Sequence, residues 1–186
     1  MKSKSSSGYD YISAVLMKKL SHILSTPLSI LCNKCLHEGK FPDLLKIGKV
    51  IPLHKGNDTT LINNYRPITL LPALSKILEK LLTKRINKFL QLHNLLDIKQ
   101  YGFRPKHSTI DAVTQFIGHT LEGIEHNKST LTIFLDFSKA FDTIDHSILL
   151  KKLPAYGIRG PAFDIIKSYL ENRKQFCELS NTKSAN

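Results

Sequence analysis

The sequence predicts an α+β fold that is rich in helices and contains a small sheet. Stretches with apolar residues at helical spacing outnumber the short β-rich stretches. The β-rich stretches are scattered between the helices and do not alternate strictly with them, which suits an α+β domain. Hydrophobic residues make up 41% of the 186 residues, which is enough for a core and argues against a disordered chain.

Two helices are predicted in the N-terminal part. The first spans residues 12–24, where apolar residues recur every three or four positions. Ser25-Thr26-Pro27 then has the pattern of a helix cap followed by proline in the first turn. We therefore expect a second helix from there to His37, ended by Gly39.

Cys32 and Cys35 have the C-x-x-C spacing of half a zinc site. The sequence holds no second C-x-x-C pair, and both residues fall on the apolar stripe of the second helix. Because a buried free cysteine behaves as a small hydrophobic residue, packing is favoured over zinc binding or redox chemistry. The odd total of three cysteines also argues against structural disulfides.

Residues 48–56 and 65–71 are predicted to form two short strands that pair with each other. Pro52 and Pro67 favour edge positions or bends for them, because proline cannot donate to a ladder.

The longest predicted helix covers about residues 73–93. Its core face would hold Leu74, Ile77, Leu78, Leu81, Leu82, Ile86, Phe89 and Leu90. Basic residues fall mostly outside that stripe, namely Lys76, Lys80, Lys84, Arg85 and Lys88. They form either a solvated outer face or a track for a phosphate backbone.

Residues 100–108 read as a loop with glycine and proline. Ser108, with Asp111 three residues later, resembles a capping box at the start of a helix that runs to about Glu125. The core face of this helix would hold Ile110, Val113, Phe116, Ile117, Leu121 and Ile124.

The stretch 129–137 is apolar and β-branched on both faces, so we expect a central strand that is buried on both sides. Two more helices are predicted over 145–153 and 161–170, separated by proline and glycine residues. A further strand is expected at 175–179.

Three aspartates follow the predicted central strand. A strand that ends in Asp136 would deliver a carboxylate to the rim of the sheet, and Mg²⁺ prefers oxygen ligands of this kind. Asp142 and Asp145 are expected to have structural roles instead, because Thr143 or Asp145 can cap the helix that starts near His146.

The charge balance indicates a polyanionic partner. The chain has 27 Lys+Arg against 15 Asp+Glu, a net charge of +12 and a pI near 9.6, which is typical of nucleic-acid binding, although lysines spread over solvated faces give the same total. No apolar run is long enough to cross a membrane, and no signal peptide follows Met1. We expect an intracellular, soluble protein.

The segment "FLDFSKAFDTIDHSIL" (134–149) resembles the first palm motif of reverse transcriptases from non-LTR (LINE-type) retrotransposons. The finger motifs of that family resemble, in order, "KVIPLHKG" (49–56), "NYRPITLLPALSKILEKLL" (64–82) and "QYGFRPKHSTIDAV" (100–113). The resemblance implies an incomplete right-hand polymerase fold, with fingers and part of the palm. It also implies a helical lead-in over 1–47 and a reverse transcriptase domain over 48–186 that is truncated after the first palm motif.

The resemblance also implies roles for single residues. Asp136 matches the first catalytic aspartate, a ligand of two Mg²⁺ ions, and the carbonyl of Phe137 would complete part of one shell. Phe141 matches the steric gate that rejects a 2′-hydroxyl. Packing with Ile144 and Ile148 is a compatible alternative for Phe141.

Basic residues would contact the substrates, which are dNTPs, an RNA template and a DNA primer by resemblance. Lys55 and Arg66 align with the residues that hold the triphosphate, and ordinary surface charge is the alternative. Arg104 lies in one of the family's motifs, but the resemblance assigns no contact to it. Lys84 and Lys88 would follow the nucleic-acid backbone.

The sequence departs from the family in one large respect. It contains no paired aspartates and ends before the family's "Tyr-x-Asp-Asp" hairpin and thumb. We therefore expect no polymerase activity from this chain alone, and an open edge on the strand at 130–136. A non-catalytic nucleic-acid-binding module is the main alternative. A phosphohydrolase or nuclease that uses Asp136 with Asp142 is a more distant one.

Overall fold

The computed structural model describes residues 6–56, 58–137, 140–179 and 182–184. The pattern of internal contacts divides the chain into two compact units, one of Met1–Lys84 with Asp145–Asn186 and one of Arg85–Ile144. The predicted combination of helices with a small sheet is confirmed. The division predicted between residues 47 and 48 stays a prediction. Among the described residues, no helix has the length and apolarity that a membrane span requires.

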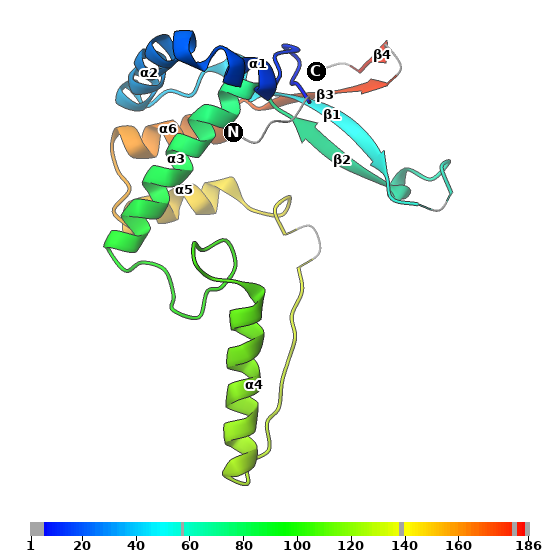
Figure 1. The fold of residues 1–186 in the computed structure, drawn as a ribbon, viewed down its shortest axis with the longest axis vertical. Coiled ribbons are helices and arrows are strands. Elements are labelled where there is room, and N and C mark those ends of the chain that lie inside the picture. Colours follow the sequence, from blue (N-terminus) through cyan, green and yellow to red (C-terminus); the bar gives the residue numbers. More distant parts are fainter. Residues whose placement is uncertain (1–5, 57, 138–139, 180–181, 185–186) are drawn as a thin grey trace. The chain divides into compact units, whose positions relative to one another are not determined.

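The first unit holds the sheet and most of the helices (Figure 1). Its strands are β1 (Ile47–His54), β2 (Tyr65–Leu70), β3 (Lys174–Leu179) and β4 (Thr182–Lys183). Its helices are α1 (Ala14–Lys19), α2 (Ser21–Glu38), α5 (His146–Ala155), α6 (Pro161–Leu170) and the first part of α3 (Ala73–Leu92), with short 3₁₀ turns at Asp43–Lys46 and Ile62–Asn64.

The break between the first two helices lies at Leu20, not at the predicted Ser25-Thr26-Pro27. The Ser25 hydroxyl donates to the carbonyl of His22 at 3.5 Å, so it bonds back to the preceding turn and caps nothing. Pro27 lies inside α2, which continues through it to Glu38. The predicted end is confirmed, because Gly39 adopts a left-handed conformation with φ 66° and its N–H donates to the carbonyl of Cys35.

Helices α2, α3 and α6 form the core of the first unit. Its buried members are Cys32, Cys35, Phe41, Leu78, Leu82 and Ile165. The interpretation of the two cysteines as packing residues is confirmed, since both are free and buried, and burial raises the pKa of both thiols. The Tyr169 hydroxyl on α6 donates to Glu79 Oε1 on α3 at 3.1 Å, which satisfies a polar group at the edge of this core.

The four strands form one mixed sheet in the order β2-β1-β3-β4. β1 pairs antiparallel with β2, as predicted, and parallel with β3 through residues Ile47 to Val50. The predicted strand at 175–179 is therefore confirmed as β3. Pro52 lies opposite Pro67, beyond the part of β1 that pairs with β3, so neither proline interrupts a central ladder.

The second unit contains the end of α3 and helix α4 (Thr109–Glu125). The predicted capping box is confirmed, because the Ser108 hydroxyl accepts from the Asp111 N–H and the Asp111 carboxylate accepts from the Ser108 N–H. The predicted core face of α4 is wrong for this unit, since all its members are exposed: Ile110, Val113, Phe116, Ile117, Leu121 and Ile124.

The central strand predicted at 129–137 is also wrong. Among the described residues these positions form no strand, and Leu131, Phe134 and Leu135 are each more than four-fifths exposed. The segment runs beside α4 (Figure 1), where the ring centroids of Phe134 and Phe116 are 6.0 Å apart. A strand needs a ladder partner, and the described strands pair only with one another.

Candidate functional site

The hairpin of β1 and β2 brings two of the predicted triphosphate-binding residues together. Arg66 lies directly opposite Leu53, so the two side chains share a face of the sheet. Lys55 follows two residues after Leu53, and its N–H continues the ladder by donating to the carbonyl of Asn64 at 2.8 Å. Lys55 and Arg66 are therefore diagonal neighbours on one face, and both are exposed.

The tip of this hairpin is held by its own hydrogen bonds. The Asn64 side chain donates to the carbonyl of Asp58 at 2.8 Å, and the Tyr65 hydroxyl donates to the carbonyl of Thr59 at 2.9 Å. The Lys55 ammonium donates to the carbonyl of Asn63 at 3.1 Å. These bonds fix the loop that joins β1 to β2, next to Lys55 and Arg66.

Asp136 does not sit at the rim of a sheet, because the segment that carries it forms no strand. Its side chain is exposed, as is that of Phe137. Its carboxylate is chemically suited to Mg²⁺, but the described residues contain no group of three His, Cys, Asp or Glu side chains that could hold a metal ion. The residues described here therefore do not by themselves fit a two-metal site.

Phe141 is not a core residue, since its side chain is 73% exposed. Its ring meets Phe103 edge-on, with 5.8 Å between the centroids. Phe103 is 90% exposed and adopts φ 57°, an uncommon backbone conformation for an aromatic residue. This contact joins two loops, so no periodic signal in the sequence predicts it.

The contact of Arg104, unassigned from sequence, is internal. Its guanidinium donates to the carbonyl of Asp97 at 2.8 Å, and the Asp97 carboxylate accepts from the N–H of Lys99 at 2.7 Å. Arg104 thus fixes the loop after α3, where it lines a hollow of about 230 Å³. Lys84 and Lys88 are exposed one turn apart on α3.

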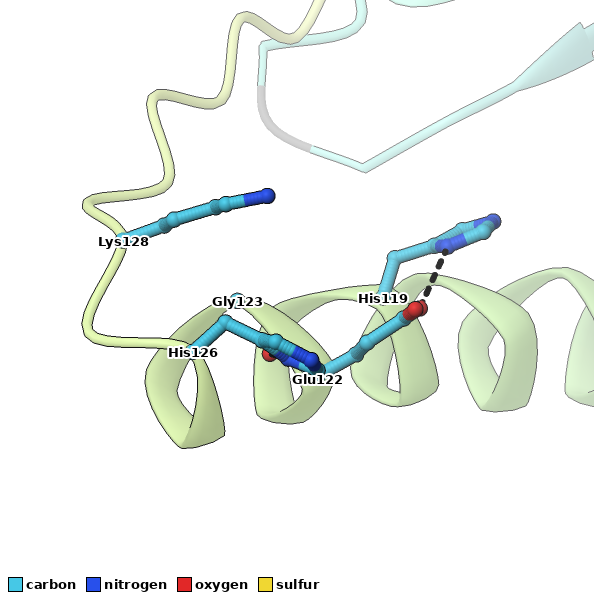
Figure 2. Close-up of a pocket in the computed structure, with 5 residues that line it drawn as sticks. All are labelled: His119, Glu122, Gly123, His126 and Lys128. Atoms are coloured by element: carbon cyan, nitrogen blue, oxygen red, sulfur yellow. Dashed lines mark hydrogen bonds and ion pairs between the residues drawn. The ribbon is translucent and has the colours of Figure 1, made fainter.

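The C-terminal part of α4 carries a polar cluster that no motif in the sequence predicts (Figure 2). His119 Nδ1 lies 3.8 Å from Glu122 Oε2, and His126 Nδ1 lies 2.8 Å from the carbonyl of Glu122. The N–H of Lys128 donates to the carbonyl of Gly123 at 2.8 Å, after Asn127 in a left-handed conformation. This turn reverses the chain, so residues after Lys128 run back beside the helix.

Asp145 caps α5, as expected from its position. Its carboxylate accepts from the N–H groups of Ser147 at 2.7 Å and Ile148 at 3.2 Å. The Ser147 side chain and these N–H groups lower the pKa of the carboxyl. Asp142 is exposed, and its predicted structural role stays a prediction.

Replacing the cap with Asp145→Ala is expected to lower the thermal midpoint by about 2–4 °C at neutral pH. The pKa of the Asp145 carboxyl is lower in the folded chain than in the unfolded chain. The cap therefore stabilises the fold fully above the unfolded pKa, and this stabilisation is lost as the pH falls through the folded pKa. Thermal scans followed by circular dichroism should show the difference vanish in acid. Asp142→Ala is the matched control, and an equal effect of both variants would contradict the assignment.

Comparison with known families matches residues 53–185 to the family described as reverse transcriptase (RNA-dependent DNA polymerase). The chain is 31% identical over 182 residues to the probable RNA-directed DNA polymerase from transposon BS of Drosophila melanogaster, covering 97% of this chain and 20% of that protein. It is 32% identical over 160 residues to the RNA-directed DNA polymerase from mobile element jockey of the same species, covering 85% and 17%.

A third relative is the probable RNA-directed DNA polymerase from transposon X-element, also of Drosophila melanogaster, at 30% identity over 168 residues, with coverage of 90% and 18%. The chain thus spans about a fifth of the length of these curated relatives. The resemblance inferred from the ordered motifs is confirmed.

Proposed function

Because this chain belongs to the reverse transcriptase family, we propose that it forms the fingers and the first palm motif of a non-LTR retrotransposon's RNA-directed DNA polymerase. Its own part in that enzyme is to bind the incoming dNTP and the template–primer duplex. The observation that carries this proposal is the hairpin that presents Lys55 and Arg66 on one face.

The chemistry of that face suits a triphosphate. Arg66 offers a forked donor and Lys55 a point charge, and phosphate oxygens accept from both. An RNA template and a DNA primer would follow the basic surface, including Lys84 and Lys88. Arg104 acts by shaping its loop, since its guanidinium is bonded to Asp97. Phe141, supported by Phe103, would press against the sugar of the nucleotide.

Members of this family are metal-dependent polymerases. Asp136 would supply one carboxylate ligand in a complete enzyme. One carboxylate can bridge two ions about 3.5–4 Å apart, but it cannot complete the coordination shell of either ion, and the described residues add no further group of ligands.

We therefore expect no primer extension by the purified chain with Mg²⁺, dNTPs and an RNA–DNA primer–template. The same preparation should bind the duplex in a fluorescence-anisotropy titration at low salt, which shows that it is folded and competent. Extension that Asp136→Ala abolishes would contradict the expectation of inactivity. Absence of duplex binding would contradict the proposed function itself.

A non-catalytic nucleic-acid-binding module is the second candidate. The net charge of +12 favours it, as does Asp136, which is exposed and joins no group of possible metal ligands among the residues that the structure describes. A nucleic-acid-binding module needs no contact with a dNTP. The two candidates therefore differ in whether added dNTP protects the hairpin. Protection of the hairpin amides by added dNTP, lost in Arg66→Ala, supports the polymerase role, whereas duplex binding without such protection supports the module.

A further inference from the structure

We propose that residues 6–13, here called the N-terminal clasp, hold the base of the β1–β2 hairpin and thereby position Lys55 and Arg66. The hydrogen bonds at the tip fix the loop of the hairpin, whereas its two strands join the rest of the first unit at the base. Groups that are held in place before a ligand arrives lose less conformational freedom when it binds. The hold on the hairpin is independent of the proposed function, whereas its effect on dNTP affinity rests on that function.

The clasp is a closed loop just before α1 (Figure 1). Ser7 and Ser13 form an antiparallel bridge across its ends. Within the loop, the N–H of Tyr11 donates to the carbonyl of Gly8 at 3.2 Å. The Ser13 side chain also caps α1. These bonds give the loop a defined shape before it meets the sheet.

Gly8 lies directly against the backbone where β2 passes into α3. A Cβ atom at Gly8 would come within 2.6 Å of the Pro72 nitrogen and 2.8 Å of the Leu71 carbonyl carbon. Both are backbone atoms, which cannot move aside as the end of a flexible side chain can. Gly8 and Pro72 are both buried. This close approach therefore requires glycine, and it ties the clasp to the end of β2.

The two tyrosines of the clasp contact β1, β3 and the turn before β1. The Tyr9 hydroxyl donates to the carbonyl of Leu44 at 3.0 Å, in the 3₁₀ turn that leads into β1. The Lys49 ammonium on β1 lies 5.4 Å from the centre of the Tyr11 ring, and the Tyr11 hydroxyl donates to Glu178 Oε1 on β3 at 3.4 Å. Lys49 and Glu178 form an ion pair, and their side chains are 17% and 15% exposed.

The clasp meets the two strands of the hairpin at the same level. Lys49 on β1 lies directly opposite Leu70 on β2, and the backbone that Gly8 contacts follows directly after Leu70. Because side chains alternate along a strand, Lys49 lies on the same face of β1 as Lys55. Tyr11 therefore contacts, at the base of the hairpin, the face that carries Lys55 at its tip.

The backbone of Tyr11 supports the same interpretation. Tyr11 adopts φ 54°, an uncommon conformation for an aromatic residue. Its side chain is 64% exposed, so burial of the ring does not explain this conformation. Such a backbone persists where surrounding contacts favour it, and the contacts with Lys49 and Glu178 do so here. Tyr11 is therefore a positioning residue for the hairpin.

Hydrogen exchange of the full chain without ligand tests the hold directly. Tyr11→Ala should speed the exchange of the β1–β2 ladder amides about tenfold, while the amides of α6 keep their rates. Tyr156→Ala, the same change at an exposed tyrosine after α5, is the matched control and should alter neither set. Tyr11→Phe keeps the ring over Lys49 and should restore most of the protection. Unchanged ladder amides in Tyr11→Ala, or equal acceleration in the ladder and in α6, would overturn the proposal.

Gly8→Ala tests the same hold by adding one carbon against the backbone at the end of β2. It should speed the exchange of the ladder amides at least as much as Tyr11→Ala does. Gly118→Ala on α4 is its control, because the added carbon there meets open space. If Gly8→Ala does not fold, the tyrosine variants decide the question.

The affinity for dNTP tests the consequence for the ligand. In a titration of the hairpin amides well below the thermal midpoint, where each variant stays folded, Tyr11→Ala should weaken dNTP binding about fivefold. Ile165→Val lowers stability from the helical core and should leave the affinity unchanged, which separates positioning from stability. Equal affinity in Tyr11→Ala and the unchanged chain would contradict the positioning role. If the unchanged chain binds no dNTP, the proposed function fails, and hydrogen exchange alone decides on the clasp.

Discussion

Raising the salt concentration from about 50 mM to about 200 mM is expected to weaken binding of an RNA–DNA duplex by about a thousandfold. This estimate assumes that about six phosphates are neutralised, each of which releases counterions, so that log K falls with a slope near −5 against log salt. The net charge of +12 makes such a number of contacts reasonable for a chain of this size. Fluorescence anisotropy with a labelled duplex measures the slope directly.

Substitutions of single lysines locate the contacts with the phosphate backbone. Lys84→Ala and Lys88→Ala on α3 should each reduce the magnitude of the slope by about 1, if the exposed face of α3 follows the phosphate backbone. Lys34→Ala on α2 removes the same charge from an exposed residue that already lies 3.8 Å from Glu38, so it serves as the control. A slope near zero would contradict nucleic-acid binding. Equal changes in all three variants would contradict a contact surface on α3.

Features that depend on neighbouring residues were predictable from the sequence. The left-handed Gly39, the capping box at Ser108 and the cap at Asp145 each follow from residues within one turn of the helix end. The β1–β2 hairpin was also predictable, because two β-rich runs follow each other with a polar, glycine-containing segment between them. The placement of Lys55 and Arg66 on one face also depends on the register that sets Leu53 opposite Arg66, and the strand period does not fix that register.

Features that depend on distant partners were not predictable. The run at 129–137 has every property of a buried strand, but burial and pairing are supplied by other segments, and the described residues supply neither. The apolar stripe of α4 is exposed for the same reason. Arg104 bonds a carbonyl seven residues away, and Phe141 meets Phe103 across two loops. Neither contact leaves a periodic signal in the sequence.

Leu78→Ala is expected to have the largest effect on stability in the first unit. Leu78 is 1% exposed, and it packs with Cys32, Phe41 and Ile165 from outside its own helix. Truncation removes the transfer free energy of the side chain and leaves a cavity, which together cost about 2–5 kcal/mol. Since domains of this kind are stable by about 5–15 kcal/mol, the variant should lose a large part of its free energy of unfolding.

Leu81→Ala is the matched control. It makes the same leucine-to-alanine change on the same helix, so its effect on helix propensity is the same and only the burial of the side chain differs. Leu81 is 36% exposed, and we expect its truncation to cost less than about 1 kcal/mol in urea denaturation followed by circular dichroism. If Leu78→Ala proves too unstable to measure, Ile165→Val offers a smaller change in the same core, at about 0.5–1.5 kcal/mol. Both α3 variants keep the helix-forming residue alanine, so a difference between them can arise only from packing. Equal losses at Leu78 and Leu81 would mean that α2, α3 and α6 do not form a shared core around Leu78.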